Sequence, residues 1–216
     1  MELDNVTQII AIRHGETDWN REARIQGHMD IGLSDVGRAQ AHLLAEALRD
    51  ETLHAIYASD LSRAFDTADA LTRGRGLTVK VDAELRERHF GAFQGRTFVE
   101  IEAADPLAAK RWRERDPDFA GEGGETLRQF FSRCIKAVAG IAAQHPGQTL
   151  AIVAHGGVMD CLYRAASRID LQAPRAWPTS NAAINRLLYT AQGLQLVGWN
   201  DVFHLESEAL DLVDKS

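Results

Sequence analysis

Residues 8–20 decide the fold of this chain: Gln8-Ile-Ile-Ala-Ile-Arg-His-Gly-Glu-Thr-Asp-Trp-Asn20. The apolar run at 9–12 stops abruptly at Arg13-His14-Gly15. A short apolar run bounded by polar residues is typical of a buried strand rather than an amphipathic helix. Gly15 keeps side-chain bulk away from the end of this strand and lets the backbone turn there. The strand therefore presents a cation and an imidazole at one point, and these groups suit a phosphate, which a guanidinium neutralises and an imidazole can attack.

The same pattern occurs a second time near the other end of the chain. A second apolar run, at 150–154, ends in His155-Gly156-Gly157. In open α/β sheets, ligands bind beyond the carboxyl ends of the strands, where the strand order reverses. If the two strands are neighbours, His14 and His155 converge at that place. The two runs together predict phosphoryl transfer through a phosphohistidine.

Strand and helix patterns alternate along the rest of the chain. Further strands are predicted at 55–58 and 77–81, with a final hairpin at 183–189 and 194–199. Helices are predicted from Ser34, from Ser59 or Asp60, in pieces broken around Pro106 over 98–115, from Thr126 to about 145, and through 159–163. This alternation predicts an α/β fold, a three-layer sandwich whose mixed, mainly parallel sheet is flanked by helices. We expect a single domain over 1–216, with the segment from about 84 to 124 forming a small helical and loop cap over the site.

Helical spacing also predicts which side chains of the first two helices face the core. For the helix after Ser34, the predicted inward stripe is Val36, Leu43, Leu44, Ala47 and Leu48. For the next helix, it is Leu61, Ala64, Phe65, Ala68 and Leu71. Both helices are therefore expected to pack on the sheet through one apolar face.

Composition excludes several classes of function. The 216 residues carry a formal net charge of −7, so no global basic field favours nucleic acid or an anionic membrane. The acidic start is no signal peptide and no stretch approaches membrane-spanning length, so a cytoplasmic location is expected. Cys134 and Cys161 lie among apolar residues at helical spacing and are predicted to be reduced core thiols. Residues 206–216 are predicted to be a mobile acidic tail.

The histidines give no sign of a metal site. No two of the eight lie within five positions of each other, so there is no local ligand pair. No glycine-rich nucleotide loop is present either. We therefore expect no metal and no cofactor, and a small-molecule phosphomonoester as the partner. The oligomeric state is left open, with a homodimer as one option.

The stretch Arg13-His14-Gly15-Glu16-Thr17 resembles the signature of the histidine phosphatase superfamily, the phosphoglycerate-mutase-like proteins. The resemblance covers most of the chain and implies the same mixed sheet flanked by helices. It implies that His14 is the nucleophile, while Arg13, Arg63 and His155 surround the phosphoryl group. Attack needs a neutral imidazole, which a reference pKa of ~6.5 supplies near neutral pH. The other ring nitrogen of His14 should be fixed by a nearby carbonyl.

Arg63 lies near the start of its predicted helix, where a cation opposes the helix dipole by ~0.3–1 kcal/mol. A local rule broken without visible compensation indicates a functional position. The compensation would be an anion at the helix N-terminus. The alternative is a surface arginine paired with Asp60 or Asp66. The family's Ser-x-x-x-Arg-Ala pattern, matched at 59–64, favours the functional interpretation.

A proton must also reach the leaving oxygen, and the stretch 84–91 offers two carboxylates for that task. Spacing alone cannot choose between Glu84 and Glu87. The family's Leu-x-Glu-x-x-x-Gly pattern selects Glu87, which would protonate the leaving alkoxide and then activate the hydrolytic water. Glu84 is then a solvated loop charge.

Other positions match phosphate contacts of the family. Asn20 and Gln26 are neutral amides that can donate without adding charge. Gly27 and Gly156 stand beside matched residues and are included with them as phosphate- or substrate-binding positions. Mutases of the family usually carry a Thr before Gly27, and they carry a longer insertion before the second His-Gly.

The resemblance therefore favours a phosphomonoester phosphatase, with a phosphoglycerate mutase as the alternative and a non-catalytic phospho-ligand-binding relative as a third option. The mutase alternative stays open because the stretch 112–115 resembles the mutases' substrate-binding arginines. The alternative for Arg111, Arg113 and Arg115 is a solvated helix face.

Overall fold

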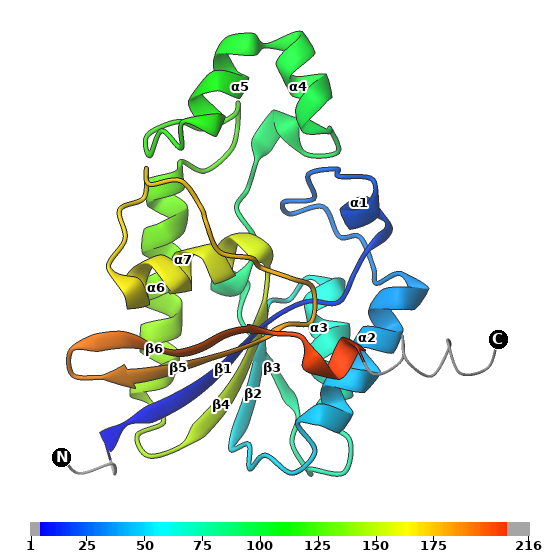
Figure 1. Ribbon diagram of the computed structural model, residues 1–216, viewed down its shortest axis with the longest axis vertical. Helices are drawn as coiled ribbons and strands as arrows, with labels where there is room; N and C mark the ends of the chain where they lie inside the picture. Colours follow the sequence, from blue (N-terminus) through cyan, green and yellow to red (C-terminus); the bar gives the residue numbers. More distant parts are fainter. Residues whose placement is uncertain (1–4, 207–216) are drawn as a thin grey trace.

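A computed structural model describes residues 5–206 of the chain, and its centre is a six-stranded sheet (Figure 1). The strand order is β3-β2-β4-β1-β5-β6. The strands are β1 (Thr7–Arg13), β2 (Ala55–Ala58), β3 (Val79–Val81), β4 (Thr149–Ala154), β5 (Ile184–Thr190) and β6 (Gly193–Asp201). Strands β1 to β4 pair in parallel, and the β5–β6 hairpin joins β1 antiparallel. The mixed, mainly parallel sheet predicted from the sequence is confirmed.

Helices cover both faces of this sheet (Figure 1). One pair is α2 (Asp35–Ala47) and α3 (Ser62–Ala70), and the opposite pair is α6 (Leu127–Ala143) and α7 (Gly156–Ser167). The remaining helices are α1 (Asp18–Arg21), α4 (Phe98–Ala104) and α5 (Pro106–Arg113). The three-layer arrangement is therefore confirmed as well.

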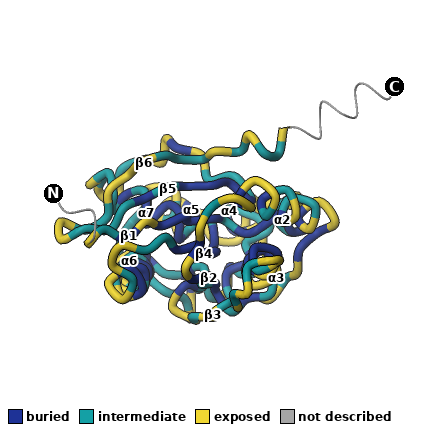
Figure 2. Tube along the Cα trace, turned by 90° about the horizontal axis from the view of Figure 1, so that it is seen from below, coloured by how far each residue is buried: buried dark blue, intermediate teal, exposed yellow. Residues whose placement is uncertain are grey.

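The alternation of side chains along β1 divides the core into two halves. Ile9 and Ala11 pack in a cluster with residues of α6 and α7, while Ile10 and Ile12 pack in a cluster with residues of α2 and α3. Successive side chains of a strand point to opposite faces, so a strand covered on both sides must be apolar throughout. Figure 2 shows the central strands as buried between the exposed outer surfaces.

The ends of β1 and β4 meet, as the two apolar runs predict. The strands pair in register, with Arg13 opposite Ala154, and the amide of His14 donates to the carbonyl of Ala154 at 3.0 Å. After β1 the chain turns to the α2 face, whereas after β4 it enters α7 on the other face. This divergence is the reversal of strand order at which α/β sheets open a crevice.

The inward face of α2 differs from the predicted stripe. Leu44 and Leu48 are buried as predicted, whereas Val36 is 50% exposed and Ala47 is exposed as well. The buried face is completed by Gly37 and Ala41. A Cβ at position 37 would stand 2.0 Å from the carbonyl oxygen of Glu16, so this glycine lets the helix lie directly on the preceding backbone. That close approach places Gly37, which hydrophobicity alone does not select, on the inward face at the start of the helix.

The start of α3 also differs from the prediction. Neither Ser59 nor Asp60 caps the helix; its N-cap is Leu61, which makes no side-chain capping bond. Asp60 pairs instead with Arg86, and the first helical amide, that of Ser62, donates to Asp30 Oδ1 at 2.8 Å. The cap comes from a remote loop, which local sequence cannot show. Phe65, predicted to face inward, is 37% exposed.

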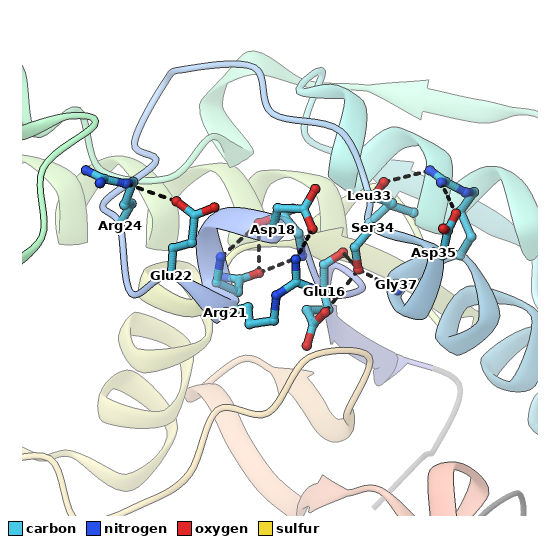
Figure 3. Close-up of polar contacts among 12 residues, drawn as sticks. Glu16, Asp18, Arg21, Glu22, Arg24, Leu33, Ser34, Asp35 and Gly37 are labelled. Carbon is cyan, nitrogen blue, oxygen red and sulfur yellow. Dashed lines mark hydrogen bonds and ion pairs between the residues drawn. The ribbon is translucent and has the colours of Figure 1, made fainter.

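The segment between β1 and α2 is held by a compact set of polar contacts (Figure 3). Ser34 is its centre: the amide donates to the Glu16 carbonyl at 2.9 Å and the hydroxyl donates to Glu16 Oε1 at 3.0 Å. The same hydroxyl accepts from the amide of Gly37 at 3.1 Å, which makes Ser34 the predicted N-cap of α2. The loop that follows His14 is thereby fixed to the body of the protein.

The segment between β3 and α6 carries α4 and α5 beyond the carboxyl ends of the strands (Figure 1). The predicted helix break at Pro106 is confirmed: α4 ends at Ala104, and Asp105 caps α5 by accepting from the amide of Ala108 at 2.9 Å. Proline suits the first position of α5, where its missing N–H is no loss. Five aromatic side chains pack here around Ile101: Phe90, Phe93, Phe98, Trp112 and Phe119.

Gly37→Ala is expected to destabilise the protein by about 1–3 kcal/mol, because the new methyl group meets backbone that cannot move aside. Urea unfolding measures the change. The matched control is Gly140→Ala in α6, where a Cβ meets nothing within 4 Å. That substitution should stabilise the helix by roughly 0.5–1 kcal/mol. Equal stabilisation by both variants would show that the close approach at Gly37 is not needed.

The remaining predictions concern the two cysteines, membrane-spanning helices and the acidic tail. Cys134 and Cys161 are buried and unpaired, as predicted. Within residues 5–206 no helix has the length and apolar character needed to cross a bilayer. The predicted acidic tail falls outside the described residues, apart from Glu206.

Candidate active site

A cavity of about 180 Å³ opens where β1 and β4 end. Eight of the residues that the sequence singles out line it: Arg13, His14, Asn20, Gln26, Gly27, Arg63, Glu87 and Gly156. Arg24, Ile25 and Phe90 complete the wall and were not predicted. Residues from the β1 loop, α3, the segment after β3 and the start of α7 thus meet around one small space.

His14 has a fixed tautomer in this cavity. Its Nδ1 lies 2.7 Å from the carbonyl oxygen of Gly15, and the side chain is 3% exposed. A carbonyl oxygen only accepts, so Nδ1 carries the proton and Nε2 of the neutral ring keeps its lone pair. The expected carbonyl partner of the second ring nitrogen is therefore present, and Nε2 is the nitrogen able to attack.

His155 lies behind the wall of the cavity. Its ring meets that of His14 edge-on, with the two centroids 5.2 Å apart, and it is fully buried. Neither ring nitrogen has a hydrogen-bond partner within residues 5–206. His155 does not itself line the cavity, and the next residue, Gly156, does. The convergence of the two histidines is observed, whereas the role of His155 stays a prediction.

Arg63 is 1% exposed, so the alternative of a surface arginine is wrong. Its Nη1 donates to the carbonyl of Met29 at 2.9 Å and its Nη2 donates to that of Gly27 at 2.8 Å. Arg13 donates from Nη1 to the carbonyl of Thr179 at 2.5 Å. The Nε of each arginine is buried without a partner in the described part of the chain. Leaving such a donor unsatisfied costs about 1–3 kcal/mol, so a ligand that accepts from it is favoured.

Burial and charge set the protonation of these groups. Burial lowers the pKa of Arg63 to about 10, so it remains a cation at neutral pH, and burial also lowers the pKa of Arg13. Burial and the nearby arginines hold the pKa of His14 and His155 well below the ordinary 6.5. The cavity thus combines two permanent cations with neutral imidazoles, which suits an anion attacked by a lone pair.

Both imidazoles are expected to stay neutral as the pH falls through 6.5. Neutral His14 is the form able to attack, so the acid limb of kcat/KM should lie well below pH 6.5. The unfolded chain takes up these protons near pH 6.5, so stability should fall as the pH drops below about 6.5, by about 1.4 kcal/mol per pH unit for each histidine. Imidazole ¹⁵N shifts between pH 5 and 7 test this directly. A His14 ring that is protonated at pH 6.5 would contradict it.

Glu87 is held by two backbone amides. Its Oε1 accepts from the amide of Arg88 at 2.8 Å and its Oε2 accepts from that of Gly157 at 2.9 Å. A Cβ at position 157 would lie 2.1 Å from Oε1, so the second glycine of the His-Gly-Gly turn makes room for this carboxylate. The competing residue Glu84 is exposed on the surface. Of these two carboxylates, Glu87 lines the cavity with His14 and Glu84 does not.

The weaker predictions also fall on the cavity wall. Asn20 Oδ1 accepts from the amide of Thr17 at 3.1 Å, which orients its amide group, and Gln26 Oε1 is buried without a partner among the described residues. Gly27 has a φ of +53°, and a Cβ there would stand 2.2 Å from Gln94 Oε1. Position 27 therefore favours glycine for its backbone conformation, and a larger residue would also have to displace the Gln94 side chain.

The three arginines at the end of α5 all have acidic partners. Arg111 pairs with Asp116 at 2.8 Å and Arg113 pairs with Glu102 at 2.7 Å. Arg115 pairs with buried Asp160 at 2.6 Å and also donates to the Leu171 carbonyl at 2.8 Å. None of the three lines the cavity beside His14.

Sequence reasoning missed the residues that hold the site in place. The hydroxyl of Thr67, in α3, accepts from the amide of Gly15 at 3.0 Å and donates to the carbonyl of Arg63 at 2.7 Å. The side-chain amide of Asn181 donates to the carbonyl of His14 at 2.9 Å. Both contacts join distant parts of the chain, and no local pattern marks either residue.

The arrangement suits phosphoryl transfer. Fixed cations stabilise an anion, a neutral imidazole supplies the lone pair, and a held carboxyl group can exchange a proton beside it. Within residues 5–206 no three histidine, cysteine, aspartate or glutamate side chains are grouped to hold a metal ion. These features define an α/β protein with a phosphate-directed site at the carboxyl ends of its strands.

Comparison with known proteins identifies the family. The family model described as the histidine phosphatase superfamily (branch 1) matches residues 9–202. The phosphoglycerate mutase-like protein 4 of Arabidopsis thaliana is 39% identical over 204 residues, covering 92% of this chain and 87% of its own. The metal-independent phosphoserine phosphatase of the same plant is 36% identical over 206 residues, covering 94% and 84%. The chain therefore belongs to the histidine phosphatase superfamily.

Among solved structures, Bacillus stearothermophilus YhfR superposes with a TM-score of 0.87 at 33% identity, covering 93% of this chain and 100% of that one. The phosphoglycerate-mutase-like fold implied by the sequence signature is confirmed.

Proposed function

We propose that this protein is a phosphomonoester phosphatase that acts on small phosphorylated metabolites through a phosphohistidine. The observation that carries the proposal is the fixed tautomer of His14, whose Nε2 faces a cavity shared with Arg13, Arg63 and Glu87. Nε2 attacks phosphorus while the arginines hold the equatorial oxygens, whose charge must be stabilised throughout a loose transfer. His155, against the His14 ring, helps to stabilise that charge.

Glu87 supports both halves of the reaction. As an acid it gives its proton to the leaving oxygen, and as a carboxylate it then takes a proton from the water that attacks the phosphohistidine. Asn20 and Gln26 donate amide hydrogens to the phosphate. Gly27 and Gly156 have no side chain, so the phosphate can approach the backbone at these positions. No step in this sequence requires a metal ion or a cofactor.

A phosphoglycerate mutase is the second candidate, because one of the relatives is named a phosphoglycerate mutase-like protein. Against it stand the ion pairs of Arg111, Arg113 and Arg115, which leave none of these arginines beside His14. A name among the relatives, metal-independent phosphoserine phosphatase, supports hydrolysis. We place the enzyme in the cytoplasm, a proposal supported by two adjacent thiols that remain unpaired.

Incubation with 3-phosphoglycerate separates the candidates. A phosphatase releases inorganic phosphate and glycerate, and a mutase forms 2-phosphoglycerate without phosphate release. An aryl phosphate extends the test, because it has no second hydroxyl group to receive the phosphoryl group and can only be hydrolysed. Binding of vanadate without turnover of any phosphomonoester would support the third option, a phospho-ligand-binding protein, and would overturn the proposal.

A further inference from the structure

A second cavity of about 180 Å³ adjoins the first, and Glu87 and Phe90 stand in the walls of both. Since Glu87 is the proposed proton donor to the leaving oxygen, the space on its other side is where the leaving group would lie. Apolar side chains form part of this wall: Phe90, Trp112, Leu127 and Phe130. The charged part decides which leaving group fits.

Three arginines line this second cavity against two carboxylates, which leaves a net positive charge. Two of the arginines are already bonded. Arg88 donates to the carbonyls of Glu125 at 2.9 Å and Phe119 at 2.6 Å. Arg115 is held by Asp160, whose carboxylate also accepts from Arg164 at 3.0 Å. Asp160 is thus shared between two guanidinium groups and does not offset the remaining charge.

The third arginine, Arg175, has no acidic partner within residues 5–206. Its one hydrogen bond there is long, 3.5 Å from Nη1 to the hydroxyl of Thr179. Arg175 also contributes to the lowered pKa of Arg13, so its charge acts on the phosphate cavity as well. A cation that lines a cavity without an ion-pair partner of its own favours an anionic occupant.

The loop that carries Arg175 is anchored on both sides of it. Before it, Arg164 donates to the carbonyl of Ala173 at 2.9 Å. After it, Trp177 stacks on Tyr163 with ring centroids 4.2 Å apart, and the Thr179 carbonyl accepts from Arg13. The backbone around Arg175 is therefore fixed relative to the catalytic arginine, so its side chain is presented from a defined position.

We propose that Arg175 selects substrates whose leaving group carries a carboxylate, so that the enzyme acts on phosphomonoesters of small hydroxy acids. The carboxylate would lie in the second cavity and accept hydrogen bonds from the Arg175 guanidinium, while the phosphate lies beside His14. This inference rests on the proposed phosphatase function and assigns a specificity-determining residue to it.

Paired substrates test the assignment. 3-Phosphoglycerate and glycerol 3-phosphate both release a primary alkoxide, but only the first leaving group carries a carboxylate. Phosphoserine and phosphoethanolamine differ in the same way. In the wild type, kcat/KM for the carboxylated member of each pair should be roughly 10- to 100-fold higher, the scale of a charge-assisted hydrogen bond. Arg175→Gln should lower that ratio roughly tenfold, and Arg175→Glu should bring it to one or below.

The control is Lys110→Gln, which also removes one positive charge. Lys110 lies on the exposed face of α5 and does not line the cavity. It should keep the wild-type ratio. Arg175 is exposed, so its variants should fold, and their thermal unfolding checks this. If the wild type hydrolyses an aryl phosphate but treats both members of each pair alike, the role of Arg175 is overturned and the phosphatase stands. If it releases phosphate from none of them, both proposals fail.

Discussion

His14→Ala is expected to lower kcat for an aryl phosphate by on the order of 10⁴-fold or more, which is the scale on which enzymes lose activity without their nucleophile. The physical reason is the lone pair on Nε2, which the bond from Nδ1 to the Gly15 carbonyl directs into the cavity. Alanine removes that lone pair and leaves the arginines in place. Phosphate should therefore still bind to the variant.

The same histidine should carry the label when the reaction is stopped rapidly with radioactive substrate. A phosphorus–nitrogen bond survives base and is lost in acid, which distinguishes it from a phosphoserine or an aspartyl phosphate. His42→Ala is the matched control, because His42 is exposed on α2 and does not line the cavity. Near-normal turnover by His14→Ala, or label on any other residue, would end the nucleophile assignment.

Folding of the His14 variant must be shown separately, since the side chain is almost fully buried. The imidazole is held neutral between arginines, and its replacement removes a desolvated polar group together with one hydrogen bond. We expect only a small change in Tm. Bound phosphate or vanadate should raise the Tm of both the variant and the wild type, because a ligand that binds only the folded state stabilises it.

The sequence predicts the site to the extent that short-range patterns determine it. Two apolar runs ending in Arg-His-Gly and His-Gly-Gly predict two buried strands, because buried parallel strands are apolar throughout. That β1 and β4 are neighbours is a hypothesis, which their pairing confirms. The family signature then supplies Arg63 and Glu87. Successive side chains along β1 point to opposite faces of the sheet, which also accounts for the two halves of the core.

Other features depend on contacts that no local pattern records. The inward face of α2 follows from the Gly37 backbone lying against Glu16, and hydropathy gives no sign of it. The N-terminus of α3 is capped by Asp30, which lies more than thirty residues earlier. Arg175 lies in an irregular loop, and only the fold brings it to the wall beside Glu87.

Glu87→Gln is the second substitution with a large expected effect. For an alkyl phosphate, kcat/KM should fall ~10²–10⁴-fold, the contribution of a placed general acid. Glutamine keeps the size of the side chain, but it cannot give a proton to the departing alkoxide. It also turns an NH₂ group toward one of the two amides that now donate to the carboxylate, those of Arg88 and Gly157. Loss of protonation and loss of orientation act in the same direction.

The leaving group separates these two effects. Dinitrophenolate departs without a proton, so the first half of the reaction should proceed in Glu87→Gln with dinitrophenyl phosphate. The second half still needs a base for the attacking water, so the phosphohistidine should accumulate. The expected record is a rapid burst of about one phenolate per enzyme followed by slow turnover, with labelled His14 present at steady state.

Glu84→Gln provides the control, because Glu84 is the other carboxylate of the same stretch and is exposed. It should hydrolyse both substrates at the wild-type rate with no burst. If Glu87→Gln slows phenolate release in the first turnover as much as it slows alkyl phosphate hydrolysis, Glu87 positions the phosphate instead of moving a proton. If the burst is absent and turnover is unchanged, the general acid must lie elsewhere, and the bonds that hold Glu87 against Gly157 serve the fold alone.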